Sequence, residues 1–177
     1  FSMNAQSGMT DGSSGTTGYG NNSVAMGTST TSSGDYSTAM GLTTTASGYI
    51  STSMGYSTQS GGYASTTMGY LTVAIGNAST AIGHSTTASD FGSLVIGQFN
   101  SSGRSVTSAS PSSALSYNSS APAFVIGNGT GAGSYSDAFK VMFNGDATVS
   151  NNLTVIQDLV VSGDVRIDGD DADFAGS

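Results

Sequence analysis

A large apolar residue followed by glycine recurs every 14 residues through the first half of this 177-residue sequence. The six copies are Met26-Gly27, Met40-Gly41, Met54-Gly55, Met68-Gly69, Ile82-Gly83 and Ile96-Gly97. A weaker echo such as Ser33-Gly34 falls halfway between copies, so the basic unit has seven residues and the large residue occurs in alternate units. A short fixed period indicates stacked coils, and 14 residues suit two short strands and two turns better than a pair of helices.

The amino-acid composition also favours β-strands over helices. The sequence has 26 Gly, no Glu and three Lys or Arg, and it is rich in Ser and Thr. Surface helices depend on Glu, Lys, Gln and Arg, whereas Ser, Thr, Gly, Asn and Asp favour strands and turns. We therefore expect an all-β chain.

Side-chain parity along each strand predicts what a coil buries, because alternate residues point to opposite faces. Ala25 shares a face with Gly27, and Ala39 shares one with Gly41. Because these residues are all small, we assign this parity to the interior of a thin, flattened coil. The opposite parity carries the six Met and Ile residues and forms an outer apolar ridge.

This ridge predicts an interface between chains. Burying one large side chain contributes roughly 1.5–3 kcal/mol, and a small-residue interior alone does not offset the entropy of ordering the coils. Identical ridges meeting on one axis imply a closed cyclic oligomer. The alternative is a monomer whose ridge packs against its own remaining sequence. The expected seam residues in the repeat are Met26, Met40, Met54, Met68, Ile82 and Ile96.

The repeat resembles the head repeats of trimeric autotransporter adhesins of the YadA type. The matching units include residues 22–27, 37–41 and 79–83, and the resemblance covers residues 21–97. It implies a left-handed parallel β-roll, a homotrimer, and an apolar residue before Gly that faces the trimer axis. Met in place of the usual aliphatic residue, and Gly61, Ile75 and Asp90 in the half-repeats, depart from the pattern.

The second half of the sequence changes period. Apolar pairs recur every six residues after Val141, with turn formers between them. A copy of the first motif returns at residues 124–127. The six-residue units resemble the intertwined triangular β-helices and β-prisms of phage tail fibres, in which three chains share one core. That resemblance places further trimer-seam residues at Leu153, Val155, Leu159, Val161, Val165 and Ile167.

The expected organisation has five parts. They are an N-terminal lead-in (1–20), β-roll head repeats (21–97), a Ser-rich connector (98–121), a transition module (122–140) and a hexad-repeat trimeric β stalk (141–177). Residues 123–141 are also similar to sequences upstream of a self-cleaving trimerisation chaperone, so one hypothesis takes Ser177 as a maturation end.

Charge and residue types exclude several functions. A formal charge of −8 with three basic residues predicts no nucleic-acid binding, and the absence of a long apolar run predicts no direct membrane insertion. His84 is the single His, and there is no Glu or Cys, so we expect no enzyme and no cofactor. A weak Ca²⁺ candidate lies at Asp168, Asp170, Asp171 and Asp173, although an acidic run near a terminus is usually only solvated.

Two further columns are candidate surfaces. Aromatic residues at turn positions predict a ligand-binding or assembly surface, and they are Tyr49, Tyr56, Tyr63, Tyr70 and Phe91. A Thr column at 30, 44, 58, 72 and 86 suits ice binding if it forms a flat exposed array, although hydroxyl ladders also simply stabilise stacked strands.

These features together predict a non-enzymatic, homotrimeric, extracellular fibre on a cell or virion surface. We expect an adhesin or receptor-binding fibre, either a cell-surface adhesin or a phage tail fibre, whose partner is a cell-surface receptor, a glycan or a matrix protein. A structural filament assembled end to end is the first alternative, and an ice-binding β-solenoid is the lesser one.

Overall fold

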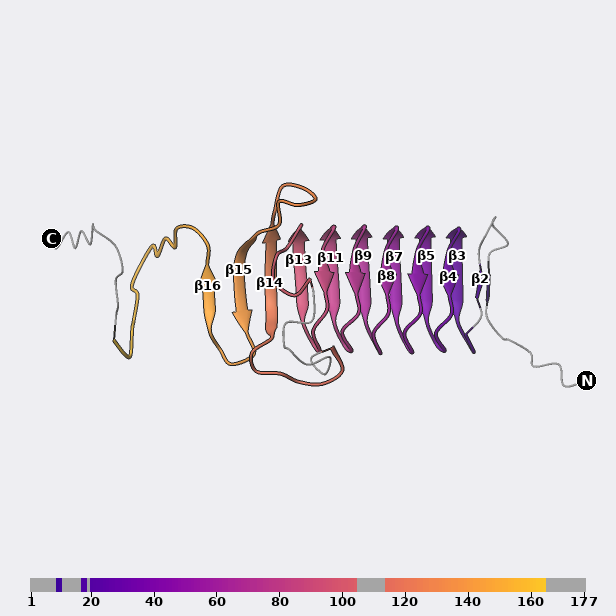
Figure 1. Cartoon of the computed structure of the whole chain (residues 1–177), viewed down its shortest axis with the longest axis horizontal. Coiled ribbons are helices and arrows are strands. Elements are labelled where there is room, and N and C mark those ends of the chain that lie inside the picture. The colour runs from indigo at the N-terminus through magenta and orange to yellow at the C-terminus, as the bar shows by residue number, and fades with distance from the viewer. Residues whose placement is uncertain (1–8, 11–16, 19, 105–113, 165–177) are drawn as a thin grey trace, which may run out of the picture.

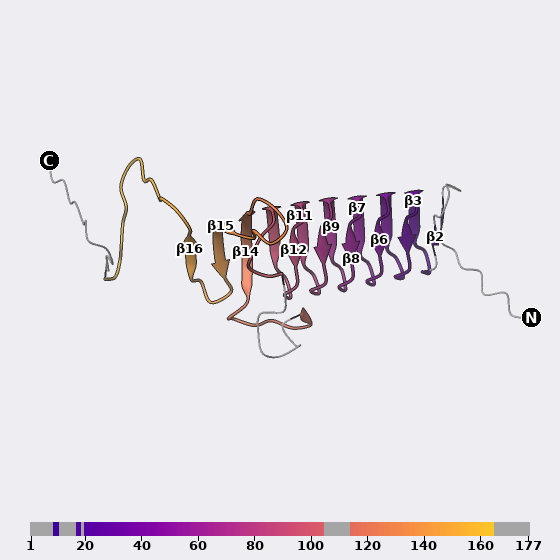
Figure 2. The same ribbon diagram turned by 45° about the horizontal axis from the view of Figure 1, so that its top comes forward.

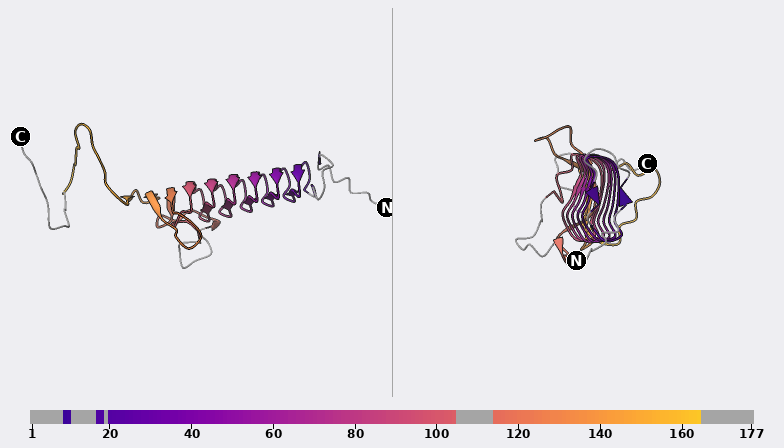
Figure 3. Two further views of the ribbon diagram at one scale, coloured as in Figure 1. Left: turned by 90° about the horizontal axis from the view of Figure 1, so that it is seen from above. Right: turned by 90° about the vertical axis from the view of Figure 1, so that its right-hand side faces the viewer.

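The 14-residue repeat folds into one coil of two strands and two turns, and successive coils stack in register (Figure 1). The structure is a computed structural model that describes residues 9–10, 17–18, 20–104 and 114–164. Its strands form two sheets that face each other across a narrow interior, as the turned views show (Figures 2 and 3). The expected all-β fold of parallel coils is confirmed.

One sheet holds the longer strands. In spatial order the long-strand sheet contains β1 (Met9–Thr10), β3 (Val24–Thr28), β5 (Thr38–Leu42), β7 (Thr52–Tyr56), β9 (Thr66–Tyr70), β11 (Thr80–His84), β13 (Leu94–Gln98), β14 (Pro122–Asn128), β15 (Asp137–Met142) and β16 (Ala147–Val149). The short-strand sheet contains β12 (Thr87–Ala88), β10 (Val73–Ala74), β8 (Gln59–Ser60), β6 (Thr45–Ala46), β4 (Thr31–Ser32) and β2 (Thr17–Gly18).

The pairing register equals the sequence repeat. Met54 pairs with Met68 and Gly55 with Gly69, one repeat apart. β14 adds a further parallel strand after a long excursion of the chain, because Ile96 pairs with Ile126. The expected return of the motif at residues 124–127 is therefore confirmed.

Small side chains fill the interior. Ala25, Ala39, Ala46 and Ala81 have no exposed surface, and small hydroxyl residues such as Ser53 share the same space. Viewed along the stack, the coils superimpose into a flattened outline (Figure 3, right). Two sheets this close leave room only for small residues, which explains the abundance of Ala, Ser and Thr in the repeat.

The glycines of the Met-Gly pairs do not lie in the interior, and the parity argument was wrong for them. Gly41, Gly55 and Gly69 are exposed, with φ near +120°. A Cβ atom on Gly55 would lie 2.0 Å from the carbonyl oxygen of Gly69 in the next coil. Glycine is required there by the backbone conformation and the close approach of stacked coils, because the strand bends toward its turn at this point.

The Thr column at 30, 44, 58, 72 and 86 lies inside the coils, where each residue is at most 1% exposed. The Thr58 hydroxyl lies 2.7 Å from the Ser53 hydroxyl across the interior. This column therefore presents no exposed surface that could bind ice. The coil bends between its short strand and the adjoining turn, and this bend, which side-chain alternation does not predict, places the Thr column inside.

Every coil contains two residues in the left-handed region, seven positions apart. Asn22, Tyr36 and Ile50 belong to one column, and Ser29 and Thr43 begin the other. Their amides continue the stacking, as where Ile50 N–H donates to the carbonyl of Asp35 at 2.9 Å. The seven-residue unit of the sequence is thus one strand and one left-handed turn.

An antiparallel hairpin ends the solenoid. β15 pairs antiparallel with β14, and β16 pairs antiparallel with β15. Part of the expected hexad region, residues 141–149, lies in this hairpin. Residues 150–164 contain no strand in the single chain, and their side chains are exposed.

Asn100 closes the edge of the short-strand sheet. Its side-chain amide accepts the Thr87 N–H at 2.9 Å and donates to the Thr87 carbonyl at 2.9 Å. It also donates to the Ser102 carbonyl at 2.6 Å. Asn100 occupies the interior Thr column one repeat after Thr86, and its side chain takes the place of a next strand on β12.

Candidate functional surfaces

The apolar ridge runs along the outer face of the long-strand sheet. Met26 is 43% exposed, Met68 39% and Ile82 37%, whereas Met40, Met54 and Ile96 are half-buried among their neighbours. Strand pairing aligns all six residues in one row. In a single chain these large side chains remain in contact with water at a cost in free energy.

The ridge extends beyond the repeats. Ile126 continues the row in β14, and Phe139 pairs with it in β15. Phe124 lies on the same side, with its ring 6.1 Å from that of Phe139 in an edge-to-face arrangement. Sequence reasoning did not include these three residues in the seam, because the connector separates them from the periodic run.

Two aromatic columns run along the turns. In the first column Tyr49 stacks on Tyr63 at 5.4 Å between ring centroids, and Tyr36 contacts Tyr49 edge-to-face. Asn77 stands between Tyr63 and Phe91 in the repeat, and its Oδ1 accepts the Tyr63 N–H at 2.9 Å.

The second aromatic column is longer. Tyr56 stacks on Tyr70 at 5.0 Å, and the ring contacts continue from Tyr70 to His84, to Phe99 and to Tyr135. His84 occupies the same column as Tyr56 and Tyr70, because it pairs with Tyr70 in the strand register. In the two stacked pairs each tyrosine ring covers a face of its neighbour, whereas the contacts of Tyr36, His84 and Phe99 in these columns are edge-to-face or tilted.

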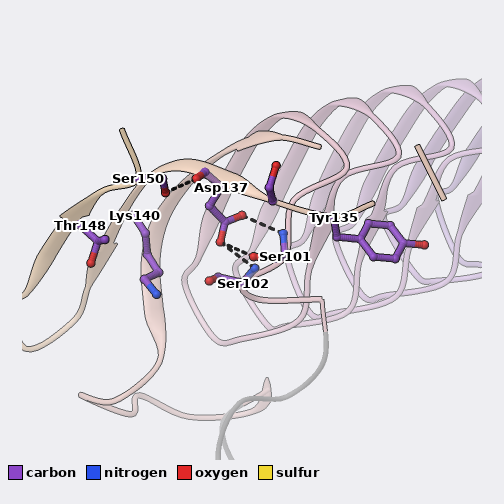
Figure 4. A pocket seen from close by; sticks show the side chains of 8 residues that line it. Ser101, Ser102, Tyr135, Asp137, Lys140, Thr148 and Ser150 are labelled. Atoms are coloured by element: carbon purple, nitrogen blue, oxygen red, sulfur yellow. Dashed lines mark hydrogen bonds between the residues drawn. The ribbon is translucent and has the colours of Figure 1, made fainter. Parts of the chain in front are cut away.

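A pocket of about 330 Å³ lies where the solenoid meets the β15–β16 hairpin (Figure 4). Its lining is mostly hydroxyl-bearing, and the residues are Ser101, Ser102, Tyr135, Ser136, Asp137, Lys140, Thr148 and Ser150. Sequence analysis did not identify this site, because its residues come from three separate segments and share no motif.

Asp137 ties the hairpin to the loop that follows β13. Its carboxylate accepts the N–H and hydroxyl of Ser101, each at 2.8 Å, and the N–H of Ser102 at 2.9 Å. Burial raises the pKa of the Asp137 carboxyl, but hydrogen bonds from Ser102 and Ser101 outweigh burial and bring the pKa below its ordinary value. The carboxylate is therefore ionised at neutral pH.

Both described cations lie close to this junction. Arg104 donates to the Ser85 carbonyl at 3.0 Å and places its guanidinium 3.9 Å from the centre of the Tyr135 ring. Lys140 lines the pocket itself.

No metal centre or membrane-spanning helix is found within the part of the chain that the structure describes. The Ca²⁺ candidate at Asp168, Asp170, Asp171 and Asp173 lies outside the described residues, as do Val165 and Ile167 of the expected seam.

Fold and surfaces together define a parallel β-solenoid repeat protein with one apolar outer face. Residues 19–44 and 74–100 match the model of the YadA head domain repeat, so two copies of this repeat lie within the β-solenoid. The coils between the two matched segments keep the same strand register. Comparisons with curated proteins and with solved structures give no match.

The family match confirms the resemblance found in the sequence. The YadA head domain is a non-enzymatic adhesin domain, in agreement with the expectation of no enzyme. YadA-family adhesins are displayed on the bacterial cell surface. The repeats accordingly imply a surface protein of the trimeric autotransporter adhesin type.

Proposed function

We propose that three copies of this chain associate through the apolar ridge and form an adhesive fibre at a bacterial surface. The observation that carries the proposal is the continuous row of Met and Ile on one face of the solenoid, which includes Met26 at 43% exposure. Identical rows facing a threefold axis would bury these side chains against each other.

The contrast between the two outer faces supports this choice of interface. The outward positions of the short-strand sheet are largely Thr, Ser and Gln, as at Thr31, Thr45 and Gln59. Water solvates these polar side chains well, and Val73 and Ile75 interrupt the face locally, so the long-strand sheet with its continuous apolar row gains more from a partner.

Threefold symmetry would also allow residues 150–164, which follow the hairpin, to bury their apolar side chains. Leu153 is 68% exposed and Leu159 67%, with Val155 and Val161 partly exposed. In our proposal these residues form the core of an intertwined three-chain stalk, which no single chain supplies. A trimer would then present three copies of any binding surface, which raises avidity without new contacts.

The end of the solenoid argues against end-to-end assembly there. Asn100 occupies the edge of β12, and the antiparallel hairpin follows β14. The capped edge of β12 cannot pair with the short strands of another chain, and the antiparallel hairpin breaks the parallel register that the next coil would need. Among the surface fibres, the family match favours an adhesin over a phage tail fibre.

Charge substitutions on the ridge test the proposal. We expect the wild-type chain to sediment with the mass of three copies and the double variant Met68→Glu with Ile82→Glu to sediment as a monomer. The matched control is Gln59→Glu with Ile75→Glu, because Ile75 is 43% exposed beside the short-strand sheet. The control should remain trimeric.

A monomeric wild-type chain, or a ridge variant that stays trimeric, would contradict the proposal. A separate pair, Leu153→Glu with Leu159→Glu, examines the stalk. We expect that pair to weaken the trimer and to leave the solenoid folded, as measured by sedimentation and circular dichroism.

A further inference from the structure

The inner face of the long-strand sheet is buried within the solenoid and becomes open to solvent where the solenoid ends. Register places one interior row through the sheet, and its members are Ala25, Ala39, Ser53, Thr67, Ala81, Val95, Val125, Lys140 and Thr148. The first seven are covered by the opposing sheet and buried. The last two follow the point at which Asn100 terminates that sheet, so they line an open pocket instead of a core (Figure 4).

Lys140 and Thr148 face this pocket as neighbours across β15 and β16. Among the described residues, neither the Lys140 ammonium nor the Thr148 hydroxyl has a hydrogen-bond or ion-pair partner. Lys140 is half-buried, and a partly desolvated ammonium gains most from a negatively charged acceptor.

Asp137 does not neutralise Lys140. Its carboxylate is directed at the Ser101–Ser102 loop, where three hydrogen bonds from that loop satisfy it. Arg104 beside Tyr135 adds a second positive charge near the same pocket. The pocket lining thus holds one cation, Lys140, and one carboxylate, Asp137, and the two described cations both lie near this end of the solenoid.

The size and lining of the pocket indicate a small polyhydroxylated ligand. Its volume, about 330 Å³, lies at the lower end of small-molecule sites, which span roughly 300–1,000 Å³. Five Ser and Thr residues, Tyr135 and Asp137 line the pocket together with Lys140. The Thr148 hydroxyl can donate and accept, whereas the hydroxyls of Ser101, Ser136 and Ser150 already donate within the protein and offer their oxygens as acceptors. These groups match the hydroxyls of a sugar, and the lysine matches a carboxylate.

We propose that this pocket binds an acidic sugar residue, with its carboxylate on Lys140 and its hydroxyls on Thr148 and the neighbouring serines. The inference deepens the proposed adhesin function by assigning it a ligand class. It does not depend on the trimer, because one chain supplies all the lining residues.

The pocket would remain open in the proposed trimer. Phe139, next to Lys140 in β15, continues the apolar ridge on the outer face, since it pairs with Ile126. Lys140 pairs with Val125, which points inward. The ridge and the pocket therefore lie on opposite faces of the same strand.

Titration of the full chain with defined sugars tests the inference. The probes are methyl glucuronoside, N-acetylneuraminic acid and neutral methyl glucoside, followed by ligand-observed NMR and calorimetry at low and high salt. We expect at least one acid sugar to bind about tenfold or more tightly than the neutral sugar, because each factor of ten needs only ~1.4 kcal/mol. High salt should weaken this binding. The two acidic probes show which class of acidic sugar is preferred.

Variants connect binding to the pocket. Lys140→Gln should lower the affinity for the acidic sugar about tenfold, Lys140→Arg should largely retain it, and Thr148→Val should lower it less than Lys140→Gln. Asp146→Asn, in the same hairpin but outside the pocket, is the matched control and should bind as the wild type does. Circular dichroism checks that each variant is folded.

Equal binding of acidic and neutral sugars, no binding of either acid at millimolar concentration, or unchanged affinity in Lys140→Gln would overturn the inference. Sedimentation of the same samples keeps the two proposals apart. A trimer that binds no acidic sugar refutes the pocket alone, whereas a monomer that binds it refutes the ridge alone.

Discussion

At the residue scale, glycine in this solenoid serves the contact between coils. Five repeat glycines, Gly27, Gly41, Gly55, Gly69 and Gly83, combine φ near +120° with a carbonyl of the next coil about 2 Å from a built Cβ atom. Any side chain there would be strained and would also push two strands apart.

A matched pair of glycine substitutions tests this requirement. Gly55→Ala should lower the free energy of unfolding by about 3 kcal/mol or more, because its Cβ would overlap Gly69. Gly61→Ala is the control, since its Cβ would lie 3.7 Å from the nearest side-chain atoms of Ile75 and Ser47. Thermal unfolding at one protein concentration compares the two, and equal losses would contradict the steric argument.

Non-glycine residues with positive φ at the turns are a second source of backbone strain. Ile50 has φ of 57°, a conformation that costs a β-branched residue more than most. Ile50→Asn should therefore raise the free energy of unfolding by about 1 kcal/mol. Ile75→Asn changes the same residue type at similar exposure without a positive φ and should give no gain. Denaturant unfolding measures both, and a gain in Ile75→Asn as large as in Ile50→Asn would refute this explanation.

At the element scale, the last short strand depends on a side chain for its edge. Asn100→Leu keeps the branched shape of the side chain but leaves the Thr87 N–H and carbonyl without their partners in a buried position. We expect a loss of about 2–4 kcal/mol, since each unsatisfied buried group costs ~1–3 kcal/mol. Hydrogen exchange of the Thr87 amide should accelerate, whereas Asn144→Leu in the exposed hairpin turn should leave it unchanged.

The hairpin is attached to the solenoid through Asp137, and this attachment depends on pH. Because the folded pKa of Asp137 is lowered from 3.8, its contribution to stability is complete above that value and is lost as pH falls through the lowered pKa. Asp137→Asn should cost about 1–2 kcal/mol at pH 7, and this cost should shrink as pH falls through the lowered pKa of the carboxyl. Unfolding followed between pH 2 and pH 7 checks this, with Asp146→Asn as control; a loss that is independent of pH would exclude the carboxylate as its cause.

At the scale of the whole molecule, stability is shared between coils and, in our proposal, between chains. Each coil contacts only its neighbours along the stack, so the solenoid behaves as a one-dimensional repeat. Association of chains would add a contribution to the free energy of unfolding that rises with protein concentration.

Concentration dependence is therefore the whole-molecule prediction. The unfolding temperature of the wild-type chain should rise by several degrees over a hundredfold range of concentration, because dilution favours dissociation. The ridge variant Met68→Glu with Ile82→Glu should lose this dependence, whereas Gln59→Glu with Ile75→Glu should keep it. Calorimetry at several concentrations measures the effect, and a concentration-independent wild type would contradict assembly.

The sequence by itself determined the coil and its length, because a strict 14-residue period leaves one register in which Met26 aligns with Met40 and Gly27 with Gly41. It also located the ridge, since strand parity places Met and Ile on the face opposite Ala25 and Ala39. A periodic sequence specifies the register and the exposed or buried face of each residue, because both follow from the residue's position within one repeat.

Only the tertiary structure decided what lies at the turns and at the end of the stack. Thr58 is buried and Gly55 is exposed because each coil bends between its strands, a geometry that alternation alone does not describe. Asn100, Asp137 and Lys140 come together through a long chain excursion and an antiparallel hairpin. Their placement follows from where the short-strand sheet stops, which no repeat can specify because the repeat has ended there.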